Sequence, residues 1–148
     1  MGERWRLLTG VDRGETFYDC SEHFSEMSAF EHPFDLHYVA GSISGWPKLY
    51  AEVWSVDSHG RHSVVGYACL TFPTHPGHYE LESFMWRPRG TASDQVSTFF
   101  LGGNPEIAYK NMVLSGNDRF GLQCLSTGTL HVRVGVITKD FNLHGVMM

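Results

Sequence analysis

The sequence predicts an all-β fold, an antiparallel β-sandwich with one short inserted helix. Three observations lead to this fold class. Several short segments alternate between apolar and polar residues with a period of two, turn-forming Gly, Pro, Asn and Asp interrupt these segments at short intervals, and a single segment has helical spacing. Many short strands separated by turns are typical of two packed antiparallel sheets. We therefore expect one domain that spans residues 1–148.

Five segments have the pattern of strands. The third, HSVVGYACLTF, is apolar on both faces, which is typical of a strand in the middle of a sheet, whereas the other four alternate and predict one buried face each. Weaker patterns predict further strands at residues 16–18, 112–114 and 120–125. The predicted inward residues are Phe34, Leu36 and Tyr38 in the first segment, Leu49, Ala51 and Val53 in the second, Tyr79 and Leu81 in the fourth, and Leu130, Val132, Val134 and Val136 in the last.

The segment TASDQVSTFFLGG predicts the inserted helix, at about residues 94–101. Ser93 is a suitable N-cap, Val96, Phe99 and Phe100 follow at helical spacing, and a Gly-Gly pair provides the stop. Because Phe99 and Phe100 are adjacent, they cannot both point into one apolar stripe of the helix. One of them is therefore a candidate for contact with a partner.

Composition and charge argue against several classes of function. The chain has 148 residues, 42% of them hydrophobic and 18% charged, which is typical of a globular domain that buries roughly 70% of its unfolded surface. The net charge is −5 and the 11 Lys and Arg residues are scattered, so we expect no nucleic-acid partner. Three Cys without a C-x-x-C motif predict buried, reduced thiols in a cytoplasmic protein. We also expect no signal peptide and no membrane-spanning helix.

The acidic residues and the nine His lack the spacing of a metal or catalytic site. Calcium takes six to eight oxygen ligands, but there is no D-x-D pair, Asp57 lies in a predicted turn, and Asp118 and Asp140 are isolated. No nucleophile elbow and no Gly-rich phosphate loop before a helix is visible. We expect no metal, no cofactor, no small-molecule substrate and no enzymatic activity. A triad assembled from distant residues, or carbohydrate binding by aromatics, stays an open alternative.

The segment HPFDLHYVAGSISGWPKLYAEVWSVDSHGRHSVVGYACLTFPTHPGHYELESFMWRPRG resembles the B9 domain family. Its distinctive parts are GWP, the hairpin VWSVDSHGR and the run GYACLTFPTHPGHYEL, and FFLGGNPE, VLSGNDRF and GVITKDFNLHGV continue the match in order from about Trp5 to Val146. The resemblance implies a C2-like β-sandwich. It also implies that the family's first N-terminal strand is absent here, which would leave one sheet edge unpaired.

The resemblance implies a function as well. B9-domain proteins belong to the Meckel syndrome complex at the ciliary transition zone, where they bind one another and help to gate entry into the cilium. We therefore expect a non-enzymatic scaffold at the transition zone and basal body, with other B9-domain proteins as partners. The alternative is calcium-independent binding to an anionic membrane surface, since some C2 folds bind lipid through a basic face. The basic residues available for that role are Lys48, Arg61, Arg87, Arg89, Arg133 and Lys139.

Seven residues are candidates for an interface: Tyr50, Trp54, Trp86, Arg87, Arg89, Phe99 and Phe100. Tyr50 and Trp54 lie on the strand face opposite the predicted inward residues, and Arg87 and Arg89 follow Trp86 as a basic-aromatic cluster. Aromatic residues and Arg are enriched in protein interfaces. The alternative is a structural role, in which Trp86 packs at the sandwich edge beside solvated Arg residues and both Phe pack under loops.

Overall fold

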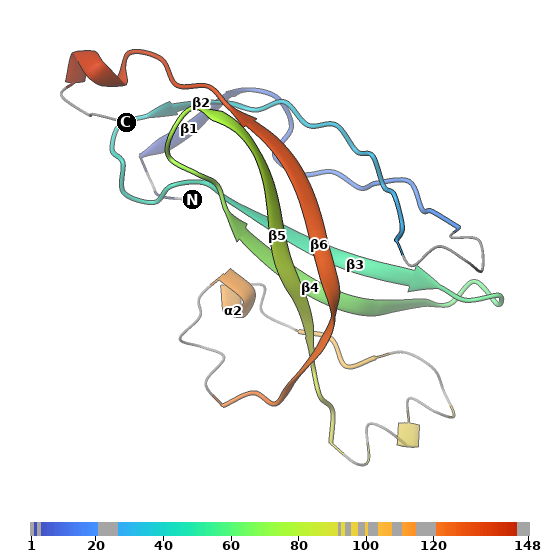
Figure 1. Cartoon of the computed structure of the whole chain (residues 1–148). Helices are drawn as coiled ribbons and strands as arrows, with labels where there is room; N and C mark the ends of the chain where they lie inside the picture. Colours follow the sequence, from blue (N-terminus) through green and yellow to red (C-terminus); the bar gives the residue numbers. More distant parts are fainter. Residues whose placement is uncertain are drawn as a thin grey trace. The chain divides into compact units, whose positions relative to one another are not determined.

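The structure is a computed structural model, and it describes residues 2, 4–20, 27–91, 93, 96–97, 100, 104–107, 111–114 and 121–144. Strands dominate it and form two antiparallel sheets (Figure 1). The elements are β1 (Trp5–Thr9), β2 (His37–Ala40), β3 (Lys48–Val56), β4 (His62–Thr71), β5 (Gly77–Pro88), α2 (Asn111–Leu114), β6 (Cys124–Val136) and the 3₁₀ helix η2 (Phe141–His144). The predicted all-β class is confirmed. The chain divides into two compact units, Met1–Trp46 and Pro47–Met148.

The first unit contains the two-stranded sheet of β1 and β2. Trp5 lies opposite Ala40 and Leu7 lies opposite Tyr38, so these four residues share one face of the sheet. All four are half-buried, whereas the neighbours that point to the other face are exposed. The predicted inward position of Tyr38 is thus confirmed. The strand begins only at His37, however, so Phe34 and Leu36, the other residues with a predicted inward position, are not part of the sheet.

An aromatic cluster packs within this unit. The ring of Trp5 meets Tyr38 and Trp46 edge-on, with centroids 6.3 and 5.1 Å apart. Trp5 Nε1 donates a hydrogen bond to the carbonyl of Ser44 at 3.0 Å. Burial, with a further contribution from Asp12, raises the pKa of Tyr38. The Trp of the GWP motif therefore has a structural role in this cluster.

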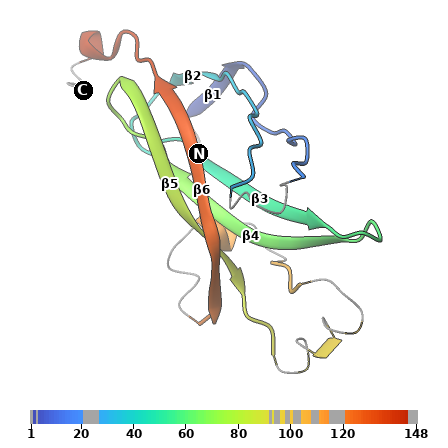
Figure 2. The same cartoon turned by 45° about the vertical axis from the view of Figure 1, so that its right-hand side comes forward.

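The second unit is built on a four-stranded sheet of order β3-β4-β5-β6. β3 pairs with β4 from Lys48, which lies opposite Thr71, to Val56, which lies opposite His62. β5 pairs with β6 along the whole length of both strands. By contrast, β4 and β5 are paired at one position, Tyr67 and Trp86. Figures 1 and 2 show two long ribbons, β3–β4 and β5–β6, that cross at an angle. The sheet is therefore two hairpins joined at a narrow meeting point.

The core of this unit lies at the meeting point. Val64, Tyr67 and Val113 are 0, 3 and 1% exposed, and the half-buried residues packed against them are Tyr50, Cys69, Trp86 and Ile107. Val113 belongs to α2, so this short helix covers the sheet here. The segment before α2 is held in place by a hydrogen bond from the Ile107 amide to the Tyr67 hydroxyl oxygen at 3.0 Å. The core thus depends on residues from the strands and from the segment that crosses them.

The strand predictions for this unit differ in outcome. β4 is a central strand, and the alternation predicted in β5 and β6 agrees with their burial. The prediction of one inward face in β3 is wrong, because Leu49 to Val53 are all half-buried. Tyr50, from the face predicted to be outward, packs against the core cluster. Both faces of β3 are therefore covered over most of its length.

Two of the weaker strand predictions are wrong, and the third is right at its last two residues. Residues 16–18 have no regular structure and residues 112–114 lie in α2. Of the strand predicted at residues 120–125, residues 121–123 precede β6, whereas Cys124 and Leu125 belong to it. A short apolar run does not distinguish a buried strand from a buried helical turn, and here the run packs across the sheet. Residue 120 and most of the predicted helix 94–101 lie outside the described residues, but Val96, Ser97 and Phe100 are helical, as predicted. Ser93, predicted as the N-cap, is itself helical, so the helical segment includes it.

Gly66 lies where β4 passes close to residues of β5 and β6. A Cβ atom there would collide with Thr127 Oγ1 and lie 3.2 Å from Met85 Cβ. We expect Gly66→Ala to lower the free energy of unfolding by about 1–3 kcal/mol, because the strands must move apart. Gly121→Ala is the control, since no described residue lies within 4 Å of its Cβ position, and it should change stability by less than about 0.5 kcal/mol. Urea denaturation measures both, and equal stability of the two variants would contradict this close approach.

Candidate interaction site

An open groove of about 410 Å³ lies beside the end of β5 in the second unit. The residues that line it are Arg87, Pro88, Arg89, Gly90, Asn104, Pro105 and Leu125. Two of these, Arg87 and Arg89, are among the candidates predicted from the sequence. The described lining includes no carboxylate, His, Cys or Ser, so it offers charge and apolar surface but no acid–base pair or nucleophile.

The groove exists because β4 and β5 separate beyond their meeting point. On one side, Arg87 continues the pairing with β6 and lies opposite Leu125. On the other side, the carbonyl of Val64 in β4 accepts a hydrogen bond from the Asn104 side chain at 2.8 Å. Asn104 and Pro105 therefore form one wall, and the end of β5 with its β6 partner forms the other.

Arg87 and Arg89 give the groove a positive charge. They are two residues apart in an extended segment, so their side chains lie on the same side of it. The Arg89 amide donates a hydrogen bond to the Gln123 carbonyl at 2.7 Å, which keeps the chain extended past the end of β5. Neither guanidinium forms an ion pair with any residue that the structure describes. Guanidinium groups without a carboxylate partner are suited to binding carboxylate or phosphate ligands.

Two of the other predicted interface residues lie against the core. Tyr50 donates a hydrogen bond to Glu52 Oε1 at 2.6 Å, and burial together with this bond raises the pKa of Tyr50. The ring of Trp86 packs on Tyr67, with centroids 6.0 Å apart. Both side chains are half-buried, so their packing stabilises the domain and leaves a limited area for a partner.

The remaining aromatic candidates are placed differently. Trp54 and Phe100 are 42 and 75% exposed, and Phe99 lies outside the described residues. Phe84 on β5 is 79% exposed and was missed by the sequence prediction. The signal was present, because the alternation that places Glu82 outward also places Phe84 outward. Exposed aromatics thus occur on β3, on β5 and in the helical segment.

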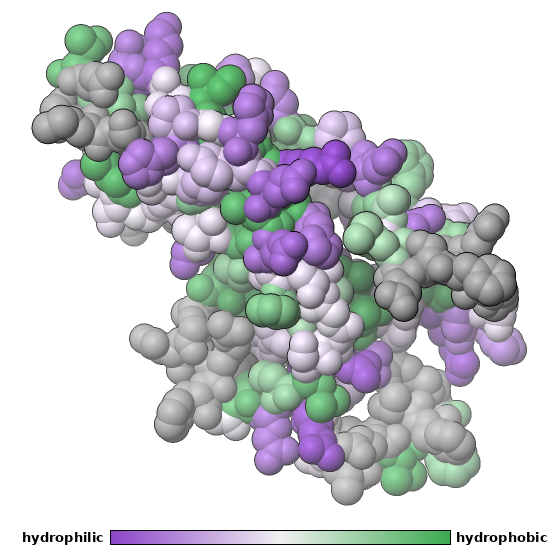
Figure 3. All heavy atoms as spheres, viewed as in Figure 1, coloured by the Kyte–Doolittle hydropathy of each residue, from purple (hydrophilic) through white to green (hydrophobic). Residues whose placement is uncertain are grey.

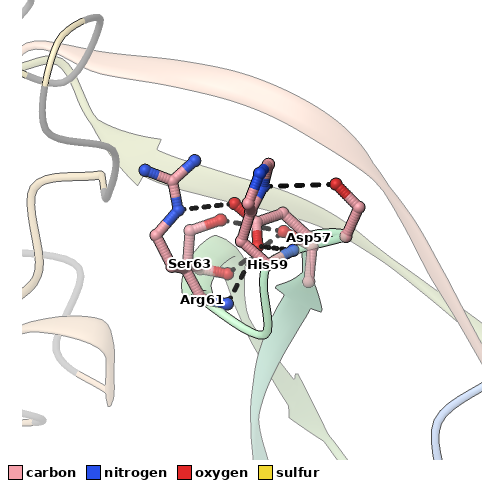
Figure 4. A network of polar contacts seen from close by, with 6 residues as sticks. Asp57, His59, Arg61 and Ser63 are labelled. Atoms are coloured by element: carbon pink, nitrogen blue, oxygen red, sulfur yellow. Dashed lines mark hydrogen bonds and ion pairs between the residues drawn. The ribbon is translucent and has the colours of Figure 1, made fainter.

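The turn between β3 and β4 engages both oxygens of Asp57 (Figure 4). Asp57 Oδ1 accepts hydrogen bonds from the amides of His59 and Arg61 at 2.8 and 2.9 Å, and Oδ2 accepts one from Arg61 Nε at 2.6 Å. The predicted turn role of Asp57 is confirmed. The bonds from Arg61 lower the pKa of Asp57 to about 2. Its carboxylate is therefore committed to the hairpin.

The other acidic residues with a possible role in calcium binding do not gather around a common point in the described structure. Between β5 and β6, Glu80 lies 3.6 Å from Arg133 as an ion pair, and Glu82 Oε1 lies 3.3 Å from His131 Nδ1. Asp118 lies outside the described residues. Among the described residues there is no group of three or more His, Cys, Asp or Glu that could hold a metal ion. The prediction of buried thiols is wrong, because Cys20 and Cys124 are exposed and Cys69 is half-buried.

Asp57 provides a test by pH. Its pKa falls from the ordinary 3.8 to about 2 on folding, so its contribution to hairpin stability is present above pH 3.8 and is lost as the pH falls through about 2. We expect the amide chemical shifts of His59 and Arg61 to titrate with a midpoint near 2 in NMR spectra. Arg61→Gln should move the midpoint toward 3.8, and Asp57→Asn should abolish the titration. A wild-type midpoint near 3.8 would show that these hydrogen bonds do not form.

Comparison with known proteins adds the family to this description. The family described as "Ciliary basal body-associated, B9 protein" matches residues 1–137. The chain is 38% identical over 145 residues to "B9 domain-containing protein 2" of Danio rerio and 37% identical to the Homo sapiens protein of that name, and each alignment covers 98% of the chain and 82% of the relative. It is also 36% identical over 132 residues to "Tectonic-like complex member MKS1" of Homo sapiens, over 80% of the chain and 23% of that protein. No solved structure matches the chain.

The two antiparallel sheets and the family match together define the class of protein. An all-β chain of this kind is consistent with the C2-like sandwich that the sequence resemblance implies. The chain belongs to the B9 family of ciliary basal body-associated proteins.

Proposed function

We propose that the chain is a non-enzymatic scaffold of a ciliary transition-zone assembly of the Meckel syndrome or tectonic-like type. In this role it binds other B9-domain proteins and supports cilium assembly and the gating of ciliary entry, in the cytoplasm at the transition zone and basal body. The observation that supports this most is that the chain is similar both to B9 domain-containing protein 2 and to MKS1, which is named as a tectonic-like complex member. We take the shared domain as the unit of association.

Exposed apolar residues of the second unit are consistent with such a role. Trp54 and Val56 are 42 and 50% exposed, and their spacing on β3 places them on one face of the strand. Phe84 and Phe100 are more exposed still. Figure 3 shows apolar residues interspersed with hydrophilic ones on one side of the molecule. Large exposed aromatics favour a partner that removes them from water, and they are enriched among residues that dominate binding energy.

Binding to an anionic membrane surface is the second candidate, and the Arg87–Arg89 pair is the observation that favours it. Two other basic residues with a possible role in lipid binding are already paired with carboxylates, Arg61 at 2.6 Å and Arg133 at 3.6 Å. The net charge of −5 also opposes long-range attraction to an anionic surface. No helix among the described residues is long and apolar enough to span a membrane. The scaffold is therefore the function we favour.

Association with B9-domain proteins can be tested by size-exclusion chromatography and pull-down with the full chain. We expect a stable complex, and we expect the double change Trp54→Ser and Phe100→Ser to weaken it by about tenfold or more, because it removes exposed aromatic anchors. Affinity measured by calorimetry gives the size of the effect.

The control is Phe17→Ser, because Phe17 is 90% exposed but belongs to the first unit, whereas Trp54 and Phe100 belong to the second. It should leave the affinity unchanged. A soluble monomer that binds no B9-domain protein would refute the scaffold function. Unaltered binding by the Trp54 and Phe100 variant would remove these two positions from the interface.

A further inference from the structure

The two guanidinium groups of the groove differ from the other arginines that the structure describes in the second unit. Arg61 and Arg133 each have a carboxylate partner, whereas Arg87 and Arg89 have none among the described residues. Two like charges that share one side of an extended segment repel each other. In a chain of net charge −5, this leaves a local positive site without its counter-charge. The electrostatic complement of the groove is thus a ligand with two negative charges.

The spacing of the two arginines limits the shape of that ligand. Alternate residues of an extended chain are roughly 6.6 Å apart, because the rise is about 3.3 Å per residue. A second extended chain has the same repeat, so carboxylates at alternate positions match Arg87 and Arg89 one to one. Pro105 and Leu125 provide apolar surface beside the guanidinium groups.

We infer that the groove lined by Arg87, Arg89, Asn104, Pro105 and Leu125 binds an extended acidic segment of a partner protein, with Asp or Glu at alternate positions. This inference rests on the proposed scaffold function, because it names the chemistry by which a partner occupies this site. Charge complementarity steers such an encounter and makes it sensitive to salt.

A peptide is favoured over a lipid headgroup by the surroundings of the groove. The two arginines lie in a row along an extended strand end, whereas Arg133 on the β5–β6 ribbon and Arg61 in the β3–β4 turn each already have a carboxylate partner. A membrane surface is bound by a wider basic face. A single row of two charges is instead matched by one chain.

The test measures binding of a fluorescein-labelled Ser-Glu-Leu-Glu-Ser peptide to the full chain by fluorescence anisotropy. A Ser-Gln-Leu-Gln-Ser peptide is the neutral control, and Ser-Leu-Glu-Glu-Ser places the same charges on adjacent residues. We expect the alternating acidic peptide to bind most tightly and to lose affinity as salt rises. The double variant Arg87→Gln and Arg89→Gln should weaken it by about fivefold or more.

The matched control is the double variant Lys48→Gln and Lys139→Gln. Both lysines are exposed and lie outside the groove, and the change in net charge is the same. This variant should bind the acidic peptide as wild type does. The single variant Arg89→Gln, at an exposed position, gives a second measurement in case the half-buried Arg87 contributes to folding, which circular dichroism checks.

Equal loss in both double variants, or equal binding of the acidic and neutral peptides, would overturn the inference. The inference would also be overturned if the chain bound phosphatidylserine vesicles but no peptide, and if the Arg87 and Arg89 changes abolished the vesicle binding. The site would then recognise lipid. A B9-domain complex that forms with unchanged affinity in the Arg87 and Arg89 variant would refute the inference and leave the scaffold function intact. Absence of any B9-domain complex would refute the scaffold function itself.

Discussion

The meeting of β4 and β5 at Tyr67 and Trp86 is the contact on which the rest of the second unit depends. The two long hairpins have extensive pairing within themselves, but this pair joins them into one sheet. The Ser83 hydroxyl strengthens the junction by donating a hydrogen bond to the Cys69 carbonyl at 3.2 Å. The core cluster gathers on the same residues, because the Tyr67 ring is buried and its hydroxyl oxygen accepts the Ile107 amide. The pairing of the two hairpins, the packing of the core and the placement of the segment before α2 therefore all depend on this junction.

The groove follows from the same junction. Beyond it the strands separate, and a polar group at the gap must find another partner or remain unsatisfied. The Asn104 side chain supplies that partner by donating to the Val64 carbonyl, which fixes one wall, while pairing with β6 fixes the other. A narrow junction thus produces both the buried core on one side and a polar, open site on the other. The positive charge of the described lining then comes from Arg87 near the end of β5 and from Arg89 just after it.

The sequence predicts those parts of the fold that rest on local pattern. The alternation in β5 and β6 and the two apolar faces of β4 are visible in the chain, and the hairpin turn at Asp57 follows from turn chemistry. The prediction fails where distant segments decide burial. The pattern places Tyr50 outward, but Val113 of α2 covers its face of the sheet, and the apolar run that contains Val113 resembles a strand although it packs across β4 as a helical turn.

The candidate site shows the same division. Arg87 and Arg89 are recognisable in the sequence as a basic pair, but their partners in the groove come from segments that no periodicity links to them, Asn104 with Pro105 and Leu125. The difference between these arginines and Arg133 is likewise a matter of neighbours. Arg133 faces Glu80 across β5 and β6, so its guanidinium has a carboxylate partner on the sheet. Arginine thus pairs within the sheet at Arg133 and is available to a partner at Arg87 and Arg89, because β4 is no longer paired with β5 beside these two residues.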